Sequence, residues 1–436
     1  MKIPSKITKT KGDILMPTQP KIKNITADEI LDSRGWPTVC ATITADDGNG
    51  AYASVPSGAS TGSHEAHEKR DMDNSRYMGR GVLDAVDAIN TIAAPKLEGT
   101  TLNQSCFDAR LISIDGTENK EKLGANATLA LSLAAARVGA LCANQPLYRY
   151  LGGINAHRLP IPMMNILNGG AHASNNADIQ EFMIMPIKFP TFREALRAGS
   201  EIYHTLGRIL KEDGKSTTVG DEGGFAPDCD SELEILDYLV RAITEAGYTT
   251  DEVKIALDVA ATEWFNDGTY TLPKSGETLG GEALIERWDF LVSRYPIISI
   301  EDPLAEDDFD SWSKMTEKLG DKIMLVGDDL FVTNEKRLQK GISGGIANSI
   351  LIKPNQIGTL TETMNVMNTA LRNGYKTIVS HRSGETEDTA VADLAVAMNA
   401  GFVKFGAPCR AERTAKYNRL LRIENLLGNS AVYGMI

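Results

Sequence analysis

Six residues whose side chains can do chemistry stand at the ends of short apolar runs in the second half of the chain. They are Asp258, Glu301, Asp328, Lys353, His381 and Lys404. A helix-like stretch follows each run, and most steps are about 25 residues, the length of one strand–helix unit in a barrel. The strands of such a barrel all end on one face. Charges gathered there are costly unless something binds, so the pattern predicts a metal-dependent enzyme.

The three acids at the start of this series are candidate metal ligands. Asp258, Glu301 and Asp328 are hard oxygen donors without nearby His or Cys residues. Such carboxylates suit Mg²⁺, which keeps several waters and takes its remaining ligands from the substrate. A single acid at a strand end is as often a solvated side chain as a metal ligand, whereas three acids on successive strands favour a metal site.

Lys353 stands alone at the end of a very apolar strand on the same rim. It could form a salt bridge to one of the acids, or it could act as a general base. A base must lose its proton near neutral pH, several pKa units below the usual value of about 10.4. Two ammonium groups about 4 Å apart repel by about 4 kcal/mol at an effective dielectric of about 20, or about three pKa units. We therefore expect Lys404 to lower the pKa of Lys353.

Further candidates lie outside the six runs. Glu222 occupies a Gly-flanked turn, VGDEGGFAP, in which the backbone can approach a ligand while the acid projects. His172 and Glu181 flank the loop that joins two apolar runs. A turn acid is usually only a turn acid, and a lone His in a Gly/Asn loop is more often a structural hydrogen bonder than a catalyst.

Two features of the sequence could bind or cover an anion. Arg382 and Ser383, in SHRSGETED, place a guanidinium group beside a hydroxyl group, and together these donors suit a phosphate or a carboxylate. The small-residue loop 57–62 is either a mobile lid or a solvated turn.

A lysine base, hard metal ions and an opposing acid indicate one reaction class. They would remove a proton α to a carboxylate and then expel a β-leaving group, with divalent cations stabilising the enolate-type intermediate. This arrangement is the known pattern of the enolase superfamily. On this interpretation the acid half of the rim holds metal and the basic half works on the substrate.

The elements that must position these residues form an irregular barrel. The runs PMMNIL and IQEFMIMP are joined by NGGAHASNNAD, which is too short for a crossover helix, so we expect the two strands to be antiparallel. Two helical stretches follow, near 192–213 and 231–246, and then the six strand–helix units. The sequence therefore predicts an α/β fold with a ββαα(βα)₆ barrel over residues 158–436.

The first part of the chain has a different character. Alternating β-branched residues over 21–46 predict strand structure, DDGNG predicts a hairpin turn, and AYASVP predicts a second strand. Helical patterns continue to about residue 150. We expect a smaller α+β domain over 21–157, preceded by a disordered Lys-rich extension over 1–20.

Bulk properties exclude several classes of protein. The chain has 436 residues and a net charge of −13, whereas nucleic-acid binders carry a basic footprint. The five cysteines are scattered, which is typical of free thiols in a reducing compartment. The most apolar stretch, 127–143, is alanine-rich and contains Arg137, so it predicts a buried helix and no membrane span.

Long stretches of the chain, from about residue 21 to 428, resemble the enolase (phosphopyruvate hydratase) family. The segments that carry the resemblance are VPSGASTG, NGGAHASNNADIQEFM, VGDEGGFAP, SIEDPL, VGDDLFVTN, ILIKPNQIGTLTET, SHRSGETED and KYNRLLRIE. The resemblance implies Mg²⁺-dependent, reversible dehydration of 2-phosphoglycerate to phosphoenolpyruvate. It also implies a cytoplasmic homodimer, in some members assembled into octamers.

The resemblance assigns a role to each matching residue. Lys353 would take the C2 proton, and Glu222 would protonate the departing 3-hydroxyl. One Mg²⁺ would be held by Asp258, Glu301 and Asp328, and a second by Ser60 together with the substrate phosphate. The residues implied to bind substrate are His172, Gln180, Glu181, His381, Arg382, Ser383 and Lys404.

Two departures from the family pattern leave alternatives open. Trp36 replaces the small polar residue of DSRGNPTV, and Phe405 replaces the Thr of the usual KTG. Because Phe405 adjoins Lys404, one alternative is a paralogue acting on a related phosphonate, of the carboxyphosphonoenolpyruvate synthase type. The other is a non-catalytic protein on the same fold, which loss of Lys353 or Glu222 would favour, although both residues are present.

Overall fold

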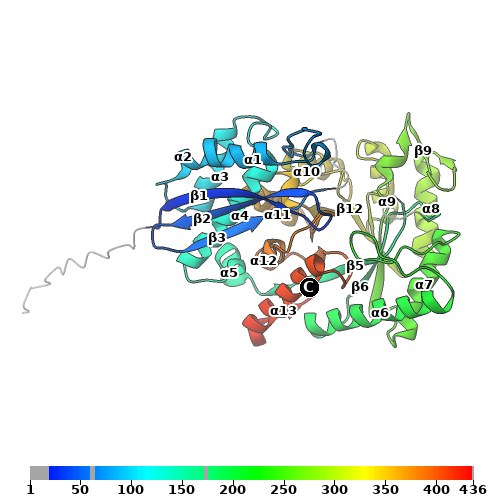
Figure 1. Cartoon of the computed structure of the whole chain (residues 1–436). Coiled ribbons are helices and arrows are strands. Elements are labelled where there is room, and N and C mark those ends of the chain that lie inside the picture. The colour runs from blue at the N-terminus through cyan, green and yellow to red at the C-terminus, as the bar shows by residue number, and fades with distance from the viewer. Residues whose placement is uncertain (1–18, 59–63, 171–174, 435–436) are drawn as a thin grey trace, which may run out of the picture.

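The computed structural model describes residues 19–58, 64–170 and 175–434. The predicted N-terminal extension lies outside the described residues as far as position 18, and so do Ser60 and His172. Figure 1 shows a small sheet with its helices on one side of the molecule and a barrel on the other.

The first element group is a three-stranded antiparallel sheet. Its strands are β1 (Ile22–Leu31), β2 (Pro37–Ala45) and β3 (Gly50–Ser54), in the order β1-β2-β3. The run 21–46, predicted as one strand region, is divided by a tight turn. Asp32 makes that turn, since its Oδ1 accepts the N–H of Arg34 at 2.8 Å and of Trp36 at 2.9 Å. The predicted turn at DDGNG joins β2 to β3.

Helices cover this sheet. They are α1 (Leu83–Asp87), α2 (Ala94–Leu97), α3 (Gln104–Asp115), α4 (Ala125–Cys142) and α5 (Leu147–Gly152). By length and composition α4 could cross a membrane, but 83% of it is buried inside the molecule, as the core helix of a soluble protein would be. It packs on β2 and β3, so its apolar character serves the core, as predicted.

Within the described residues, eight strands close into a barrel in the order β11-β12-β13-β14-β15-β5-β6-β7. The strands are β5 (Ile161–Asn168), β6 (Glu181–Pro186), β7 (Val253–Asp258), β11 (Ile297–Glu301), β12 (Met324–Gly327), β13 (Ser349–Ile352), β14 (Lys376–Ser380) and β15 (Phe402–Lys404). Strand β6 runs antiparallel to both β5 and β7, and the remaining pairs are parallel. This irregular start is the one predicted from the sequence.

The barrel is surrounded by helices and has two short additional sheets. The helices are α6 (Phe192–Glu212), α7 (Glu232–Glu245), α8 (Gly281–Arg294), α9 (Phe309–Leu319), α10 (Glu335–Gly344), α11 (Leu360–Arg372), α12 (Ala390–Ala397) and α13 (Ala411–Leu427). The short strands are β4 (Arg158–Leu159), which pairs with β16 (Val432–Tyr433), and β8 (Phe265–Asn266), β9 (Thr269–Thr271) and β10 (Thr278–Leu279).

The two-residue period of the strands decides which side chains face the barrel axis. Phe402 packs inside the barrel with residues such as Leu351, whereas Val403 belongs to the core between strands and helices. The next residue on the inner face of β15 is therefore Lys404, and the next beyond Leu351 is Lys353. The inner faces of the strands thus carry their terminal charged residues onto one rim.

Candidate active site at the barrel rim

One pocket opens at the carboxyl ends of the barrel strands and gathers most of the predicted residues. Its lining is Gln180, Glu181, Glu222, Asp258, Ala260, Glu263, Asp302, Asp328, Asp329, Lys353, Ser380, His381, Arg382, Ser383 and Lys404. Glu301 lies beside the lining, within 2.9 Å of Lys404 Nζ. The strand-end pattern therefore converges on one site, as predicted.

The ammonium group of Lys404 lies among the carboxylates. Its Nζ is 2.6 Å from Asp258 Oδ2, 2.9 Å from Glu301 Oε2 and 3.3 Å from Glu181 Oε2, and all four side chains are buried. Although burial acts to lower the pKa of Lys404, the surrounding carboxylates raise it well above its usual value. The acidic and basic side chains of the rim are therefore interleaved, because each lysine pairs directly with acids, while the division into metal-binding acids and substrate-binding basic residues stays a prediction.

Lys353 pairs with Asp328 at the end of the neighbouring strand. Burial is the largest single influence and acts to lower the pKa of Lys353, but the negative charges of Asp328 and Glu301 act against it and the pKa is raised. Lys404 does act in the predicted direction, as does Arg382. The expectation of a lowered pKa is nevertheless contradicted, since a directly bonded carboxylate dominates over two less direct cations.

Buried carboxylates outnumber the cations at this rim. Burial raises the pKa of Glu181, Glu301 and Asp302, and neighbouring acids raise each of them further. Burial, with Asp328 nearby, also raises the pKa of Asp329 to about 7. A divalent cation would neutralise this surplus of buried, negatively charged carboxylates, and Mg²⁺ prefers carboxylate oxygens as ligands.

Glu222 reaches the pocket from the turn between α6 and α7. Its carboxylate Oε2 accepts a hydrogen bond from Asn165 Nδ2 at 3.3 Å and lies 3.2 Å from His381 Nε2. Gly223 has a φ of +87°, and a Cβ on Gly406 would lie 2.8 Å from the backbone oxygen of Glu222. The glycines thus let the turn lie close against the segment after β15 and fix the direction of the acid.

Arg382 and Ser383 stand on the same rim, after β14. Arg382 is buried, and its Nη1 and Nη2 donate to the two carboxylate oxygens of Glu65 at 3.1 and 3.2 Å. Its Nη1 also donates to Asn355 Oδ1 at 3.1 Å. A guanidinium held this way presents a fixed fork of donors at the pocket, which suits an oxyanion.

Family comparisons agree with this geometry. A family model described as the enolase N-terminal domain matches residues 22–151, and one described as the enolase C-terminal TIM barrel domain matches residues 156–435. The chain belongs to the enolase family. Membership makes it a lyase of the enolase superfamily that acts on a small molecule, and members of this family typically bind Mg²⁺.

Four residues in or next to the pocket of this enolase-family chain were missed as candidates in the sequence: Asp302 and Asp329 line the pocket, and Glu65 and Asn165 bond its residues Arg382 and Glu222. Asp302 accepts the backbone N–H of Asp328 at 2.9 Å and of Asp329 at 2.8 Å, so it holds the segment after β12. Doubled acids in SIEDPL and VGDDLF were a usable signal for both Asp302 and Asp329. Glu65 and Asn165 carried no such signal, because their partners lie far away along the chain.

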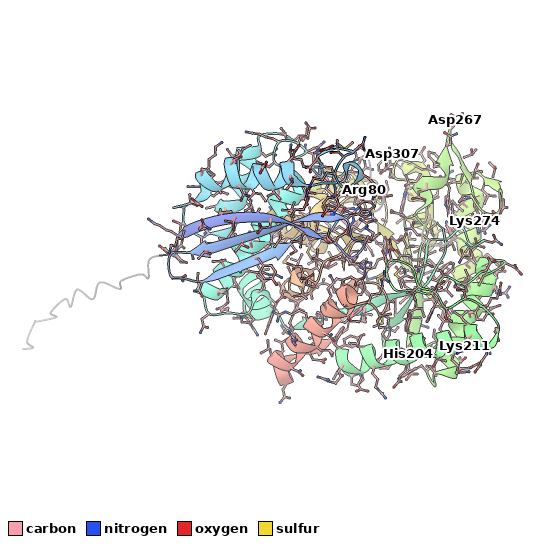
Figure 2. The ribbon with its side chains drawn as sticks, viewed as in Figure 1. Arg80, His204, Lys211, Asp267, Lys274 and Asp307 are labelled. Carbon is pink, nitrogen blue, oxygen red and sulfur yellow. The ribbon has the colours of Figure 1, made fainter. Side chains whose placement is uncertain are left out.

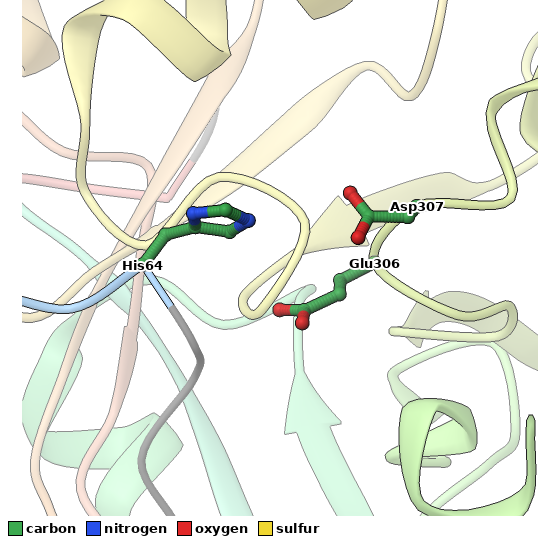
Figure 3. Close-up of side chains that lie close together, drawn as sticks. All are labelled: His64, Glu306 and Asp307. Carbon is green, nitrogen blue, oxygen red and sulfur yellow. The ribbon is translucent and has the colours of Figure 1, made fainter.

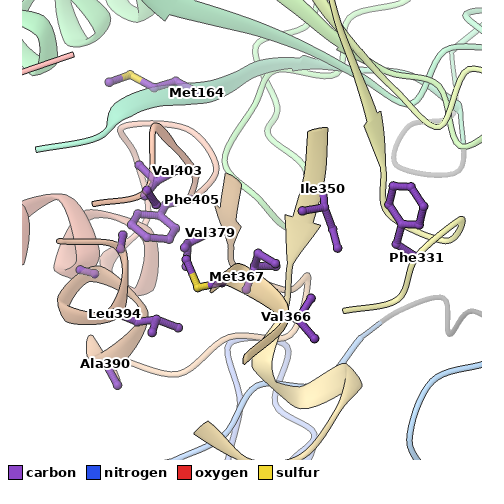
Figure 4. Close-up of a cluster of buried hydrophobic side chains, with 14 of the residues drawn as sticks. Met164, Phe331, Ile350, Val366, Met367, Val379, Ala390, Leu394, Val403 and Phe405 are labelled. Carbon is purple, nitrogen blue, oxygen red and sulfur yellow. The ribbon is translucent and has the colours of Figure 1, made fainter. Parts of the chain in front are cut away.

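The two departures from the usual enolase-family motifs lie away from the pocket lining. Phe405 is fully buried, and its ring packs 6.0 Å from that of Tyr417. Figure 4 shows it among the hydrophobic side chains of Val403, Val379 and Leu394. Trp36 stacks under the guanidinium of Arg80 at 4.4 Å, in the smaller domain. Within the described residues, neither side chain lines the pocket.

Proposed function

We propose that this chain catalyses the Mg²⁺-dependent, reversible dehydration of 2-phosphoglycerate to phosphoenolpyruvate. The observation that carries the proposal is the convergence on one pocket of Lys353, Glu222 and the acids Asp258 and Asp328. A base, an acid and a set of hard oxygen donors at one site suit proton abstraction α to a carboxylate, followed by loss of a β-hydroxyl.

Lys353 is the proposed general base that takes the proton from C2. As a base it must be neutral, so the negative charge of its partner Asp328 has to be offset. Arg382 and Lys404 both act to lower the pKa of Lys353 and favour its neutral form. Its side chain lines the pocket at the end of a rigid strand, a placement that holds Nζ in one position.

Glu222 is the proposed acid that protonates the leaving 3-hydroxyl. It is 4% exposed and is contacted by the polar groups of Asn165 and His381, which orient its carboxyl group. Gln180 and Glu181 would line the substrate on the side of the 3-hydroxyl, and so would His172, which lies outside the described residues. The resemblance of NGGAHASNNADIQEFM to the family motif supports this assignment by analogy.

Arg382 and Ser383 would bind the phosphate, with His381 beside them, and Lys404 would bind near the substrate carboxylate. Phosphate oxygens would compete for the Arg382 donors that now bond Glu65. Glu65 therefore shares or yields these donors when substrate binds.

The proposed ligands of the first Mg²⁺ are Asp258, Glu301 and Asp328, and Ser60 with the substrate phosphate would hold the second. When bound, Mg²⁺ would supply positive charge that offsets these carboxylates and the negative charge that develops on the substrate.

The family resemblance supports three further proposals about the setting. The protein would work in the cytoplasm, in glycolysis and gluconeogenesis, and it would be a homodimer, with an octamer as the larger form. Neither alternative function has a specific observation in its favour. The phosphonate paralogue depended on Phe405, and that side chain packs in the core. A non-catalytic protein would not need the complete set of charged groups at the rim.

The test is an assay of the purified full chain with Mg²⁺ and 2-phosphoglycerate. Formation of phosphoenolpyruvate, followed by its ultraviolet absorbance, is the expected result, and chelation of Mg²⁺ should abolish it. A folded, metal-loaded sample that produces no phosphoenolpyruvate would overturn the proposal.

A further inference from the structure

A second group of potential metal ligands lies outside the active-site pocket. It consists of His64, Glu306 and Asp307, which we call the interdomain cluster (Figure 3). One ring nitrogen of His64 and one carboxylate oxygen of each acid all lie within 4.8 Å of one another. Ligand atoms around a Zn²⁺ ion at about 2.0–2.2 Å are separated by less than this, so small side-chain rotations would bring all three into contact with one ion.

The three donors come from two domains. His64 belongs to the segment that follows β3 in the smaller domain, whereas Glu306 and Asp307 lie between β11 and α9 of the barrel. Figure 3 shows the imidazole approaching from one ribbon and the two carboxylates from another. An ion bound by all three would therefore join the domains.

The backbone on the barrel side is held in place without an ion. The N–H of Glu306 donates to Thr262 Oγ1 at 3.0 Å, and its carbonyl accepts from Arg337 Nη2 at 2.8 Å. The same guanidinium lies 3.4 Å from Asp307 Oδ1, an ion pair in which the Asp307 side chain is 63% exposed. Such a pair is weak, so Asp307 can turn toward a cation at small cost.

The backbone on the other side is held as well. Glu65, the residue after His64, bonds both terminal nitrogens of Arg382, and Ala66 donates its N–H to the carbonyl of Gln356 at 2.8 Å. His64 is therefore presented by a segment already fixed on the barrel. Donors placed in advance reduce the ordering that metal binding requires.

The donor types select the class of metal. One imidazole and two carboxylates suit Zn²⁺ and similar first-row ions, and solvent can supply the remaining ligand at this exposed site. Mg²⁺ prefers oxygen ligands alone and is a poor match for the imidazole. The interdomain cluster thus differs in chemistry from the all-carboxylate group in the pocket.

We propose that the interdomain cluster binds one zinc-class divalent ion, which fastens the 64–65 segment of the smaller domain to the barrel. The consequence for catalysis rests on the proposed function. Fixing His64 keeps the neighbouring Glu65 on Arg382, so the ion would oppose the binding of substrate phosphate to that guanidinium. Excess zinc-class ions would then raise the KM for substrate.

Zinc binding to the full-length protein tests the site directly. Equilibrium dialysis with Zn²⁺ would be done in excess Mg²⁺, which occupies the pocket carboxylates. We expect His64→Ala and Asp307→Asn each to bind one zinc ion fewer than the wild type. If either variant still binds that ion, its Kd for zinc should rise by more than the tenfold to hundredfold that changes outside the ligand set produce. Zn²⁺ should also raise the Tm of the wild type more than that of His64→Ala.

Two matched variants control for general binding to exposed imidazoles. His67 is an exposed residue of the same segment, and His204 lies on α6, well away from Asp307 (Figure 2). His67→Ala and His204→Ala should both retain the zinc equivalent and the Tm increase. A His64→Ala protein that binds zinc as the wild type does would overturn the proposal, and so would an equal loss in His67→Ala.

The catalytic consequence has its own measurement. The KM for 2-phosphoglycerate should rise with Zn²⁺ in the wild type and change less in His64→Ala. Zinc binding without any dehydratase activity would refute the proposed function alone. Full activity with no zinc lost in His64→Ala would refute this inference alone.

Discussion

Arg413 donates a hydrogen bond from Nη1 to Nδ1 of His381 at 2.6 Å, and this contact decides which tautomer His381 adopts. A guanidinium has no acceptor, so Nδ1 must accept and the imidazole proton resides on Nε2. Nε2 is the atom that lies 3.2 Å from Glu222 Oε2. A fully buried arginine on α13 thus directs a neutral N–H at the proposed proton donor.

His381 should stay neutral across the working pH range. Burial, with the Arg413 charge beside it, lowers the pKa of His381 to about 3. We expect the ¹⁵N chemical shifts of its ring to show the Nε2–H tautomer and to remain constant from about pH 5 to 8, near the usual His pKa of about 6.5. A titration of this ring near its usual pKa would contradict the assignment.

The same buried imidazole should reduce stability in acid. In the unfolded chain His381 takes up a proton as the pH falls below the usual His pKa of about 6.5. In the folded chain it does so only near pH 3, so the free energy of unfolding decreases as the pH falls from about 6.5. At pH 5 the loss is about 2 kcal/mol. Urea unfolding at pH 7 and pH 5 should show that this loss is smaller in His381→Asn. Equal pH dependence in both proteins would be the opposing result.

Binding of Mg²⁺ should release protons. Burial and neighbouring acids raise the pKa of Glu301, one of the proposed ligands, so its carboxyl group holds a proton more readily than an exposed one and must release it to bind metal. We expect the Mg²⁺-induced increase in Tm to grow with pH. Calorimetry in buffers of different ionisation enthalpy should detect the released protons. Metal binding that is independent of pH between 5 and 8 would count against these ligands.

Phe405 should matter for stability and not for substrate choice. Its ring is fully buried against Tyr417, so Phe405→Thr, which restores the common family residue, should cost about 3–5 kcal/mol, while Phe405→Leu should cost less. The substrate preference of the folded variants should remain that of the wild type. Urea unfolding and kcat/KM for 2-phosphoglycerate measure the two effects. A switch toward phosphonate substrates in Phe405→Thr would revive the paralogue hypothesis.

The barrel and most of its rim could be predicted from the sequence because strand periodicity acts locally. An apolar run that ends in Asp258 or Lys404 determines both a strand and the direction of its last side chain. The closure of eight strands then brings those ends together. Glu222 lies in a turn and has no periodic signal, so its flanking glycines made it a candidate and the motif resemblance gave it a role.

The pairings within the site could not be predicted in the same way. Glu65 and Arg382 are separated by 317 positions, and only the packing of the two domains brings them into contact. The position of Lys404 between Asp258 and Glu301, and the pairing with Asp328 that raises the pKa of Lys353, depend on distances between strands that no run of residues encodes. The division of the 21–46 run depended on an Asp32 side-chain turn, a signal present in DSRGW but not used.

The division of labour between Lys353 and Glu222 is the central claim, and exchange of the C2 proton of 2-phosphoglycerate with solvent deuterium tests it most directly. Glu222→Gln with Mg²⁺ should exchange this proton yet form no phosphoenolpyruvate. Lys353→Ala, with the same metal and an unchanged far-ultraviolet circular dichroism spectrum, should lose exchange by about 10²–10⁴-fold. If the two variants lose exchange equally, or Lys353→Ala retains it, the account of the active site is wrong.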